Sequence, residues 1–308
     1  MKLYAPEYYK EFTCIADRCK HSCCVGWEID VDDAAMKKYA EYKGNYSDKI
    51  TESIENNAEP HFKLDWGERC PHLNEKGLCN IILNVGEDYL CHICREHPRF
   101  YNDTPRGREV GLGLACEEAC RIILDSDNYD KIVEIDDIDG ESCDEYFDTI
   151  RHREVIYGVL CDKLMPYQER LDAIYSQYGV TPKFISDSEA RKLLESLEYL
   201  DTSHKELFSL YSSDSEFLRE GEKQLERALA YFIYRHCTEA WDERDFRVSL
   251  AFCFFCERLL TSVAKKCDMY DAARIISEEI EYSEDNTEAI KNFFDLRIQS
   301  LKTLRRKP

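Results

Sequence analysis

Cysteines crowd the first 120 residues of this 308-residue chain, and thiols at close spacing either bind metal or pair as disulfides. Ten of the 16 cysteines precede residue 121, and they fall into four groups. The groups are Cys14, Cys19, Cys23 and Cys24, then Cys70 and Cys79, then Cys91 and Cys94, then Cys116 and Cys120. The two-residue gap between Cys91 and Cys94 lets both sulfurs reach one metal ion. We therefore expect a thiolate metal site in this half of the chain.

Metal binding is preferred to a disulfide framework because the chain is large enough to fold without covalent staples. Hydrophobic residues make up 44% of the sequence, and its first residues lack the features of an export signal, so we expect a cytoplasmic protein with reduced thiols. Zinc and iron–sulfur clusters both accept four thiolates, so the number of ligands does not separate them. A mixed zinc site that uses histidine is also open, and the candidates are His21, His72, His92 and His97.

The charge of the chain restricts its partners. Affinity for nucleic acid comes largely from Lys and Arg, and the sequence has 41 of these against 62 Asp and Glu, a net charge of −21. No apolar run is long enough to cross a bilayer. We therefore expect neither a nucleic-acid nor a membrane partner, whereas a basic protein substrate would suit this charge.

Residue patterning predicts a mainly α fold, in which a cysteine-rich, loop-rich, metal-binding N-terminal half precedes an α-helical bundle. We place the cysteine-rich domain at residues 1–124, an acidic connector at 125–148 and the helical domain at 149–308. Apolar spacing predicts helices within the segments 165–179, 188–200, 225–241, 245–267 and 289–304. The segment 245–267 is apolar on nearly all sides near its middle, which indicates a buried central helix.

The sequence also predicts one short N-terminal helix and a group of structural residues in the helical half. A short helix is expected within residues 32–44, with Asp32 or Asp33 at its start and Gly44 at its end. The six cysteines after residue 120 and the neighbours Arg235 and His236 are interpreted as structural residues of the helical half.

The cysteine motifs, taken in order, resemble a known family. The stretches CIADRCKHSCCVGWEID, CPHLNEKGLCNI, NVGEDYLCHICREHPRFYN and GLGLACEEACRIIL are similar to the flagellin lysine-N-methylases, a family related to proteins with a CxxCxxCC-type zinc- or iron-chelating domain. The resemblance runs from about residue 3 to residue 124. It implies methyl transfer from S-adenosylmethionine to lysine side chains of flagellin, by a protein that carries an iron–sulfur cluster of the 4Fe-4S type.

The same resemblance implies a set of metal ligands. The family's cysteines correspond to Cys14, Cys19, Cys23, Cys24, Cys70, Cys79, Cys94 and Cys116. Cys91 and Cys120 stand where the family does not require a thiol, so they are secondary candidates. Around Cys116 the family has Ser-Cys-Pro-Glu, whereas this chain has Glu117 in place of the proline, which should alter the turn before the following helix.

Residues for cofactor binding and catalysis are harder to identify. The sequence has no glycine-rich dinucleotide loop, and the radical cofactor spacing CxxxCxxC is absent because Cys24 follows Cys23 directly. Arg95 and Arg99 could bind the cofactor's carboxylate or support the metal loops. Trp27 could face a cationic sulfonium or cover the metal site, and we favour cover. No catalytic base is identified.

Three functions of different classes remain open on the sequence. The first is a lysine methyltransferase with an iron–sulfur cluster. The second is a non-catalytic zinc- or iron–sulfur-binding protein whose acidic helical half binds a partner. The third is a redox sensor that uses Cys23 and Cys24 or Cys91 and Cys94. The oligomeric state does not follow from one sequence.

Overall fold

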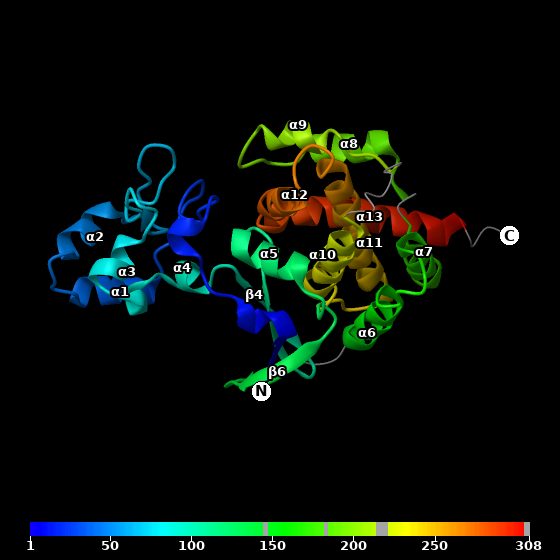
Figure 1. Ribbon diagram of the computed structural model, residues 1–308, viewed down its shortest axis with the longest axis horizontal. Helices are drawn as coiled ribbons and strands as arrows, with labels where there is room; N and C mark the ends of the chain where they lie inside the picture. The colour runs from blue at the N-terminus through cyan, green and yellow to red at the C-terminus, as the bar shows by residue number, and fades with distance from the viewer. Residues whose placement is uncertain (144–146, 182–183, 214–220, 305–308) are drawn as a thin grey trace. The chain divides into compact units, whose positions relative to one another are not determined.

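The computed structural model describes residues 1–143, 147–181, 184–213 and 221–304. These residues form two units (Figure 1). The cysteine unit comprises Thr13–Arg99 and Cys116–Glu118, and the helical unit comprises Met1–Phe12, Phe100–Ala115 and the described residues from Ala119 onward. The boundaries between these two units therefore differ from the expected domain boundaries at residues 124 and 148. Among the described residues, every helix is too short or too polar to cross a membrane.

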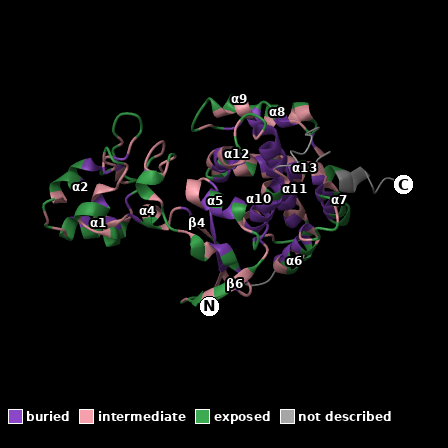
Figure 2. Ribbon diagram, viewed as in Figure 1, coloured by how far each residue is buried: buried purple, intermediate pink, exposed green. Residues whose placement is uncertain are grey.

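The helical unit is built around two long helices. Its helices are η1 (Glu7–Glu11), α5 (Glu117–Asp125), α6 (Thr149–Leu160), α7 (Tyr167–Tyr178), α8 (Asp187–Glu195), α9 (His204–Phe208), α10 (Glu222–His236), α11 (Glu243–Val263), α12 (Met269–Ile276), η5 (Ser277–Glu281) and α13 (Glu284–Leu304). Helices α10 and α11 pack side by side, and Figure 2 shows that both are largely buried. The prediction of a mainly α fold is confirmed.

The structure confirms the helices with the clearest sequence signals. Helix α7 follows Pro166 and ends at Gly179, which adopts a φ of 61°, a left-handed conformation that favours glycine. Every residue of α11 from Val248 to Val263 is buried, as expected of the central helix. Two predicted ends are wrong: α8 stops at Glu195 rather than near residue 200, and α1 (Asp33–Glu41) stops before Gly44.

A four-stranded sheet belongs to the helical unit and was not expected from the sequence. In order across the sheet, its strands are β4 (Arg99–Thr104), β5 (Gly107–Leu112), β1 (Lys2–Pro6) and β6 (Ile132–Asp137). Strand β1 runs parallel to β5 and antiparallel to β6. The Lys2 ammonium pairs with Glu134 and Asp137 at 2.7 and 2.8 Å. Residues 132–137 of the expected acidic connector form β6, whereas residues 144–146 lie outside the described residues.

A buried ion pair joins this sheet to the helices. Glu109 on β5 accepts two hydrogen bonds of 2.6 Å from the guanidinium of Arg153 on α6, and both side chains are almost fully buried. Such a two-point pair fixes the orientation of both partners. The ion pair therefore fixes the position of α6 relative to the sheet.

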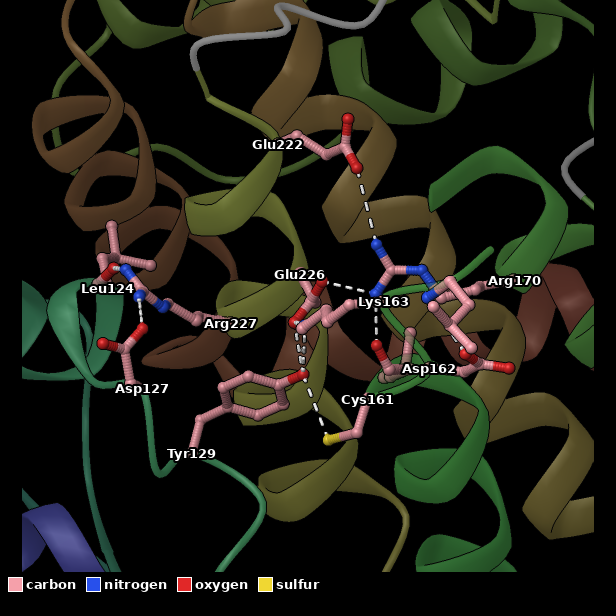
Figure 3. A network of polar contacts seen from close by, with 12 residues as sticks. Leu124, Asp127, Tyr129, Cys161, Asp162, Lys163, Arg170, Glu222, Glu226 and Arg227 are labelled. Atoms are coloured by element: carbon pink, nitrogen blue, oxygen red, sulfur yellow. Dashed lines mark hydrogen bonds and ion pairs between the residues drawn. The ribbon is translucent and has the colours of Figure 1, made fainter. Parts of the chain in front are cut away.

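A second polar network lies where α7 approaches α10 (Figure 3). The buried carboxylate of Glu226 accepts hydrogen bonds from Arg170 at 2.5 Å, from the Tyr129 hydroxyl and from Lys163. The next residue along, Arg227, donates to Asp127 and to the carbonyl of Leu124 at 2.5 and 2.6 Å. Consecutive residues of α10 therefore anchor two different segments of the helical unit.

Glu257 is a buried carboxyl with few polar contacts, in the middle of α11. Its Oε1 accepts a hydrogen bond from Tyr167 at 3.4 Å, and its Oε2 lies 3.9 Å from Nε of Arg258. Burial raises the pKa of Glu257 from its usual 4.5 to about 7, against the opposing effects of Arg258 and Tyr167. The folded protein therefore binds this proton more tightly than the unfolded chain does.

This raised pKa predicts a pH-dependent stability. The favourable contribution of the protonated Glu257 is complete below pH 4.5 and is lost as the pH rises through about 7, a total of about 3 kcal/mol. The variant Glu257→Gln should therefore be more stable than the parent at pH 8, by up to this amount, and similar to it at pH 4.5. Urea unfolding at both pH values measures the difference, with the exposed Glu154→Gln of α6 as control. An equal effect of Glu257→Gln at the two pH values would contradict the assignment.

The cysteine unit is made of short elements joined by loops. They are η2 (Ala16–Arg18), α1 (Asp33–Glu41), α2 (Ser47–Ser53), β2 (Ile54–Glu55), β3 (His61–Phe62), α3 (Asn80–Asn84), η3 (Glu87–Tyr89) and α4 (His92–Glu96). Asp32 accepts a hydrogen bond from the backbone of Ala35 and so caps α1, as predicted. The core of this unit includes Ile29, Tyr39 and Phe62, and cysteines complete it.

Candidate metal centre

Five cysteines of the cysteine unit share one apolar core, and we call them the inner set. They are Cys24, Cys70, Cys79, Cys91 and Cys94. The backbone N–H of Cys70 donates to the carbonyl of Cys24 at 2.8 Å, which joins two loops that are distant in sequence. The sulfur of Cys91 lies 3.4 Å from the hydroxyl of Tyr39, a residue of α1. Local structure therefore brings thiols from four chain segments into one core.

The inner thiols affect one another's ionisation. Burial, followed by the charges of Cys24, Cys79 and Cys91, raises the pKa of Cys70 to about 12. A hydrogen bond to Cys91, together with burial, raises the pKa of Cys94. Cys24 and Cys91 differ. Hydrogen bonds from Cys23 and Ser22 and the nearby charge of Arg69 lower the pKa of Cys24 to about 7 despite burial. A hydrogen bond from Cys94 lowers the pKa of Cys91. The thiols of Cys70 and Cys94 therefore stay protonated at neutral pH.

The other four cysteines of this unit form a second group, the outer set. They are Cys14, Cys19, Cys23 and Cys116. Cys14 and Cys23 are exposed, and Cys19 and Cys116 are half-buried. Burial, with smaller contributions from Glu117 and Cys116, raises the pKa of Cys19 to about 11. The pKa of Cys23 is also raised, first by its hydrogen bond to Cys24, with smaller contributions from the charges of Cys116 and Cys14.

Glu117 organises the outer set, a role that the sequence analysis missed. Its carboxylate accepts hydrogen bonds from the backbone N–H groups of Lys20 and His21 at 2.7 and 3.2 Å. The Cys19 thiol also donates to it, at 3.6 Å. Glu117 follows Cys116 directly and is the first residue of α5. Glu117 therefore ties the Cys116 turn to the Cys19–Cys23 loop.

Two further candidate ligands, Cys120 and His72, are buried and hydrogen-bonded to other residues. Cys120 is buried in the helical unit, where its thiol donates to the carbonyl of Tyr270 at 3.5 Å. Both ring nitrogens of the buried His72 are hydrogen-bonded, to Tyr46 at 3.1 Å and to Ser53 at 2.9 Å, so neither is available to a metal. Burial lowers the pKa of His72 to about 4, which keeps it neutral.

The three residues proposed for cofactor binding lie near these loops. The indole N–H of Trp27 donates to the carbonyl of Cys23 at 2.6 Å, and its ring lies 6.1 Å from that of His97. This hydrogen bond ties Trp27 to the Cys23 loop. Arg95 on α4 contacts Glu96 and His92 at 3.4 Å, and Arg99 donates to the carbonyl of Arg95 at 3.3 Å.

Across the described residues, no three Cys, His, Asp or Glu side chains are arranged so that they could hold a metal ion as they stand. The inner and outer sets are thus groups of cysteines that share similar surroundings. Ligation by either set would require its thiols to move closer together.

Comparison with known proteins gives two informative matches. The lysine-N-methylase of Salmonella typhimurium strain LT2 is 31% identical to this chain over 137 residues, which are 40% of this chain and 32% of that protein. The flagellar biosynthetic protein FliU of Salmonella muenchen is 31% identical over 136 residues, which are 40% of this chain and 77% of that protein. The match thus spans about a third of the lysine-N-methylase and most of FliU.

Two further comparisons found nothing. No family model matches the chain, and no solved structure is similar to it. FliU, of which 77% is covered at 31% identity, defines the relationship. This chain belongs to the flagellin lysine-N-methylase family.

Proposed function

We propose that this protein is a lysine N-methyltransferase that acts on flagellin or a similar protein, with S-adenosylmethionine as the methyl donor. The similarity to a lysine-N-methylase and to FliU carries the proposal. In the reaction, the sulfur–methyl bond breaks as a nitrogen–methyl bond forms on a neutral lysine amine. S-adenosylhomocysteine leaves, and the proton of the amine passes to solvent or to a base.

We further propose that the cysteine unit holds an iron–sulfur cluster or zinc. Support comes from the chemistry of the donors, because thiolates suit both and five thiols share one apolar core. The place of Cys91 in that core supports adding it to the eight ligands implied by the family. The hydrogen bond of Cys120 in the helical unit supports a structural role instead. When bound, the centre would supply a Lewis-acidic group and cross-links between loops.

The chain's own residues would position the donor. Arg95 and Arg99 lie in and just after α4, beside Cys94, and we propose that they bind the carboxylate of the methionine moiety. Trp27 is hydrogen-bonded to the Cys23 loop and would keep water from this region. The acidic surface of the protein suits a substrate segment that presents lysine.

A labelling assay tests the activity. Protein purified without oxygen is mixed with flagellin and S-adenosylmethionine that carries a labelled methyl group. We expect label on flagellin lysines, located by mass spectrometry, and no label on flagellin whose amines were acetylated beforehand. Absence of label on the unmodified substrate, with metal-loaded protein, would overturn the proposed activity.

A non-catalytic metal-binding interaction protein is the second candidate. It is favoured by the absence of a known cofactor loop in the sequence. Under this alternative, the protein would retain metal and bind a partner without transferring label. The labelling assay therefore separates the two candidates.

The role of Glu117 gives a prediction about the metal. Glu117→Ala removes the acceptor of two backbone hydrogen bonds in the Cys19–Cys23 loop, so it should weaken metal binding by about 10- to 100-fold. Competition with a chromogenic chelator measures the affinity. Glu75→Ala, at an exposed position of the same unit, is the matched control and should bind metal like the parent. Equal affinities for both variants would contradict the role of Glu117.

A further inference from the structure

The cysteine unit exposes one tryptophan side chain almost completely. Trp66 lies between β3 and Cys70, and it is 95% exposed to solvent. An indole is large and mainly apolar, and tryptophans in folded proteins are on average highly buried. Tryptophan is also among the residues that contribute most to binding at protein interfaces. An indole that packs against almost nothing in its own chain is therefore available to a partner.

The exposed indole belongs to a closed turn, residues 65–69, which we call the Trp66 turn. The backbone N–H of Asp65 donates to the carbonyl of Arg69 at 2.7 Å, and the N–H of Arg69 donates back at 3.3 Å. Within the turn, Glu68 has a φ of 55°, a left-handed conformation that residues other than glycine rarely adopt. Its carbonyl accepts the N–H of Gly26 at 3.0 Å. These bonds hold the turn in one conformation, which lowers the entropic cost of binding to it.

Two carboxylates flank Trp66 in this turn. Asp65 and Glu68 are both exposed, and neither forms an ion pair with any residue that the structure describes. The two nearest cations along the chain, Lys63 and Arg69, donate to backbone carbonyls outside the turn at 3.1 and 3.5 Å. The carboxylates of the Trp66 turn therefore have no cationic partner in this chain.

We infer that the Trp66 turn binds lysine side chains of the protein substrate, with the indole face and the two carboxylates around the ammonium group. Both kinds of group attract a cation, and the net charge of −21 favours a basic segment. A purely apolar segment, or a second copy of this acidic chain, would leave the carboxylates without a counter-charge. The inference rests on the proposed function, in which the substrate is a protein that presents lysine.

Binding of flagellin tests the inference with the intact protein, purified without oxygen. Flagellin carries a fluorophore on an introduced cysteine, and anisotropy is measured without S-adenosylmethionine. Trp66→Ala should weaken binding about 2- to 5-fold, the effect of one exposed contact between a cation and an indole, and Trp66→Phe should weaken it less. Leu164→Ala, at a position of the helical unit that is 96% exposed, is the matched control and should bind like the parent. Equal affinities of the parent and Trp66→Ala, or a parent that does not bind, would overturn the inference.

Acetylated flagellin identifies the group that is bound. Acetylation removes the ammonium charge, so the parent and Trp66→Ala should bind acetylated flagellin equally weakly. A difference between them that survives acetylation would mean that the indole contacts an apolar segment, contrary to the inference. The double variant Asp65→Asn/Glu68→Gln should weaken binding of unmodified flagellin at low salt and have little effect at high salt. Unchanged affinity of this variant at low salt would exclude the carboxylates from the contact.

Kinetics distinguish this inference from the proposed activity. In the labelling assay, Trp66→Ala should raise KM about 2- to 5-fold and leave kcat unchanged, as expected of a contact that is equally strong in the ground state and the transition state. A lower kcat at unchanged KM would contradict a binding role. Labelling that is indifferent to Trp66→Ala would refute this inference alone, whereas binding that depends on Trp66 without any labelling would refute the proposed activity alone.

Discussion

Removal of the proposed metal is expected to unfold the cysteine unit and to leave the helical unit folded. The longest helix of the cysteine unit is α1, with nine residues, and five cysteines belong to its core. Short elements with a thiol-rich core derive much of their stability from metal, about 10 kcal/mol for structural zinc at neutral pH. The helical unit has its own core around α10 and α11, and the nine cysteines of the cysteine unit lie outside it.

Hydrogen exchange followed by mass spectrometry resolves the two units. After treatment with chelator, amides of α1 and α2 should lose protection, whereas those of α10 and α11 should keep it. Chelator that has been saturated with metal beforehand is the control and should change neither unit. Unchanged protection throughout residues 13–99 after complete metal removal would show that the cysteine unit folds without metal.

The replacement of Glu226 by glutamine is expected to have the largest effect in the helical unit. Its carboxylate neutralises the buried guanidinium of Arg170 and also accepts hydrogen bonds from Tyr129 and Lys163 (Figure 3). Glu226→Gln leaves the charge of Arg170 without its main partner, because the contact of Arg170 with Glu222 is longer, at 3.5 Å. Breaking a buried pair in this way costs about 3–5 kcal/mol.

The chain contains a matched control for this substitution. Glu222 lies one helical turn before Glu226 and contacts the same arginine, but it is partly exposed. Glu222→Gln should cost less than about 1 kcal/mol, as is usual for exposed pairs. Urea unfolding followed by circular dichroism compares the two variants. If Glu226→Gln is no more destabilising than Glu222→Gln, the network of Figure 3 does not stabilise the helical unit.

The parts of the fold that the sequence predicts depend on local signals. Helix α7 begins after Pro166 and ends at Gly179, and its period of apolar residues is visible within twelve positions. The sheet depends instead on pairing between distant segments, such as Leu3 with Asp136, and no local pattern reveals such a partner. The acidic composition of β6 suggests a solvent-exposed connector, but the ion pairs of Lys2 compensate part of that charge.

The candidate site likewise has features that the sequence predicts and features that it does not. Spacing and family resemblance identify the cysteines, but they do not separate Cys23 from Cys24, because that separation depends on how irregular loops fold. Glu117 could have been noticed as an acidic residue at a helix start beside a cysteine. Its partners, the backbone groups of Lys20 and His21, are almost a hundred residues away. His72 could not have been excluded as a ligand before Tyr46 and Ser53 were found at its ring nitrogens.

Metal analysis tests whether the cysteine unit holds a thiolate-bound metal, as we propose. Iron, zinc and acid-labile sulfide are measured per chain on protein purified without oxygen, together with a visible spectrum. We expect at least stoichiometric metal, either as iron with matching sulfide and a broad brown absorption or as zinc in a colourless solution. Protein with only traces of metal, whose nine thiols in this unit all react freely while it stays folded, would refute the proposed metal binding.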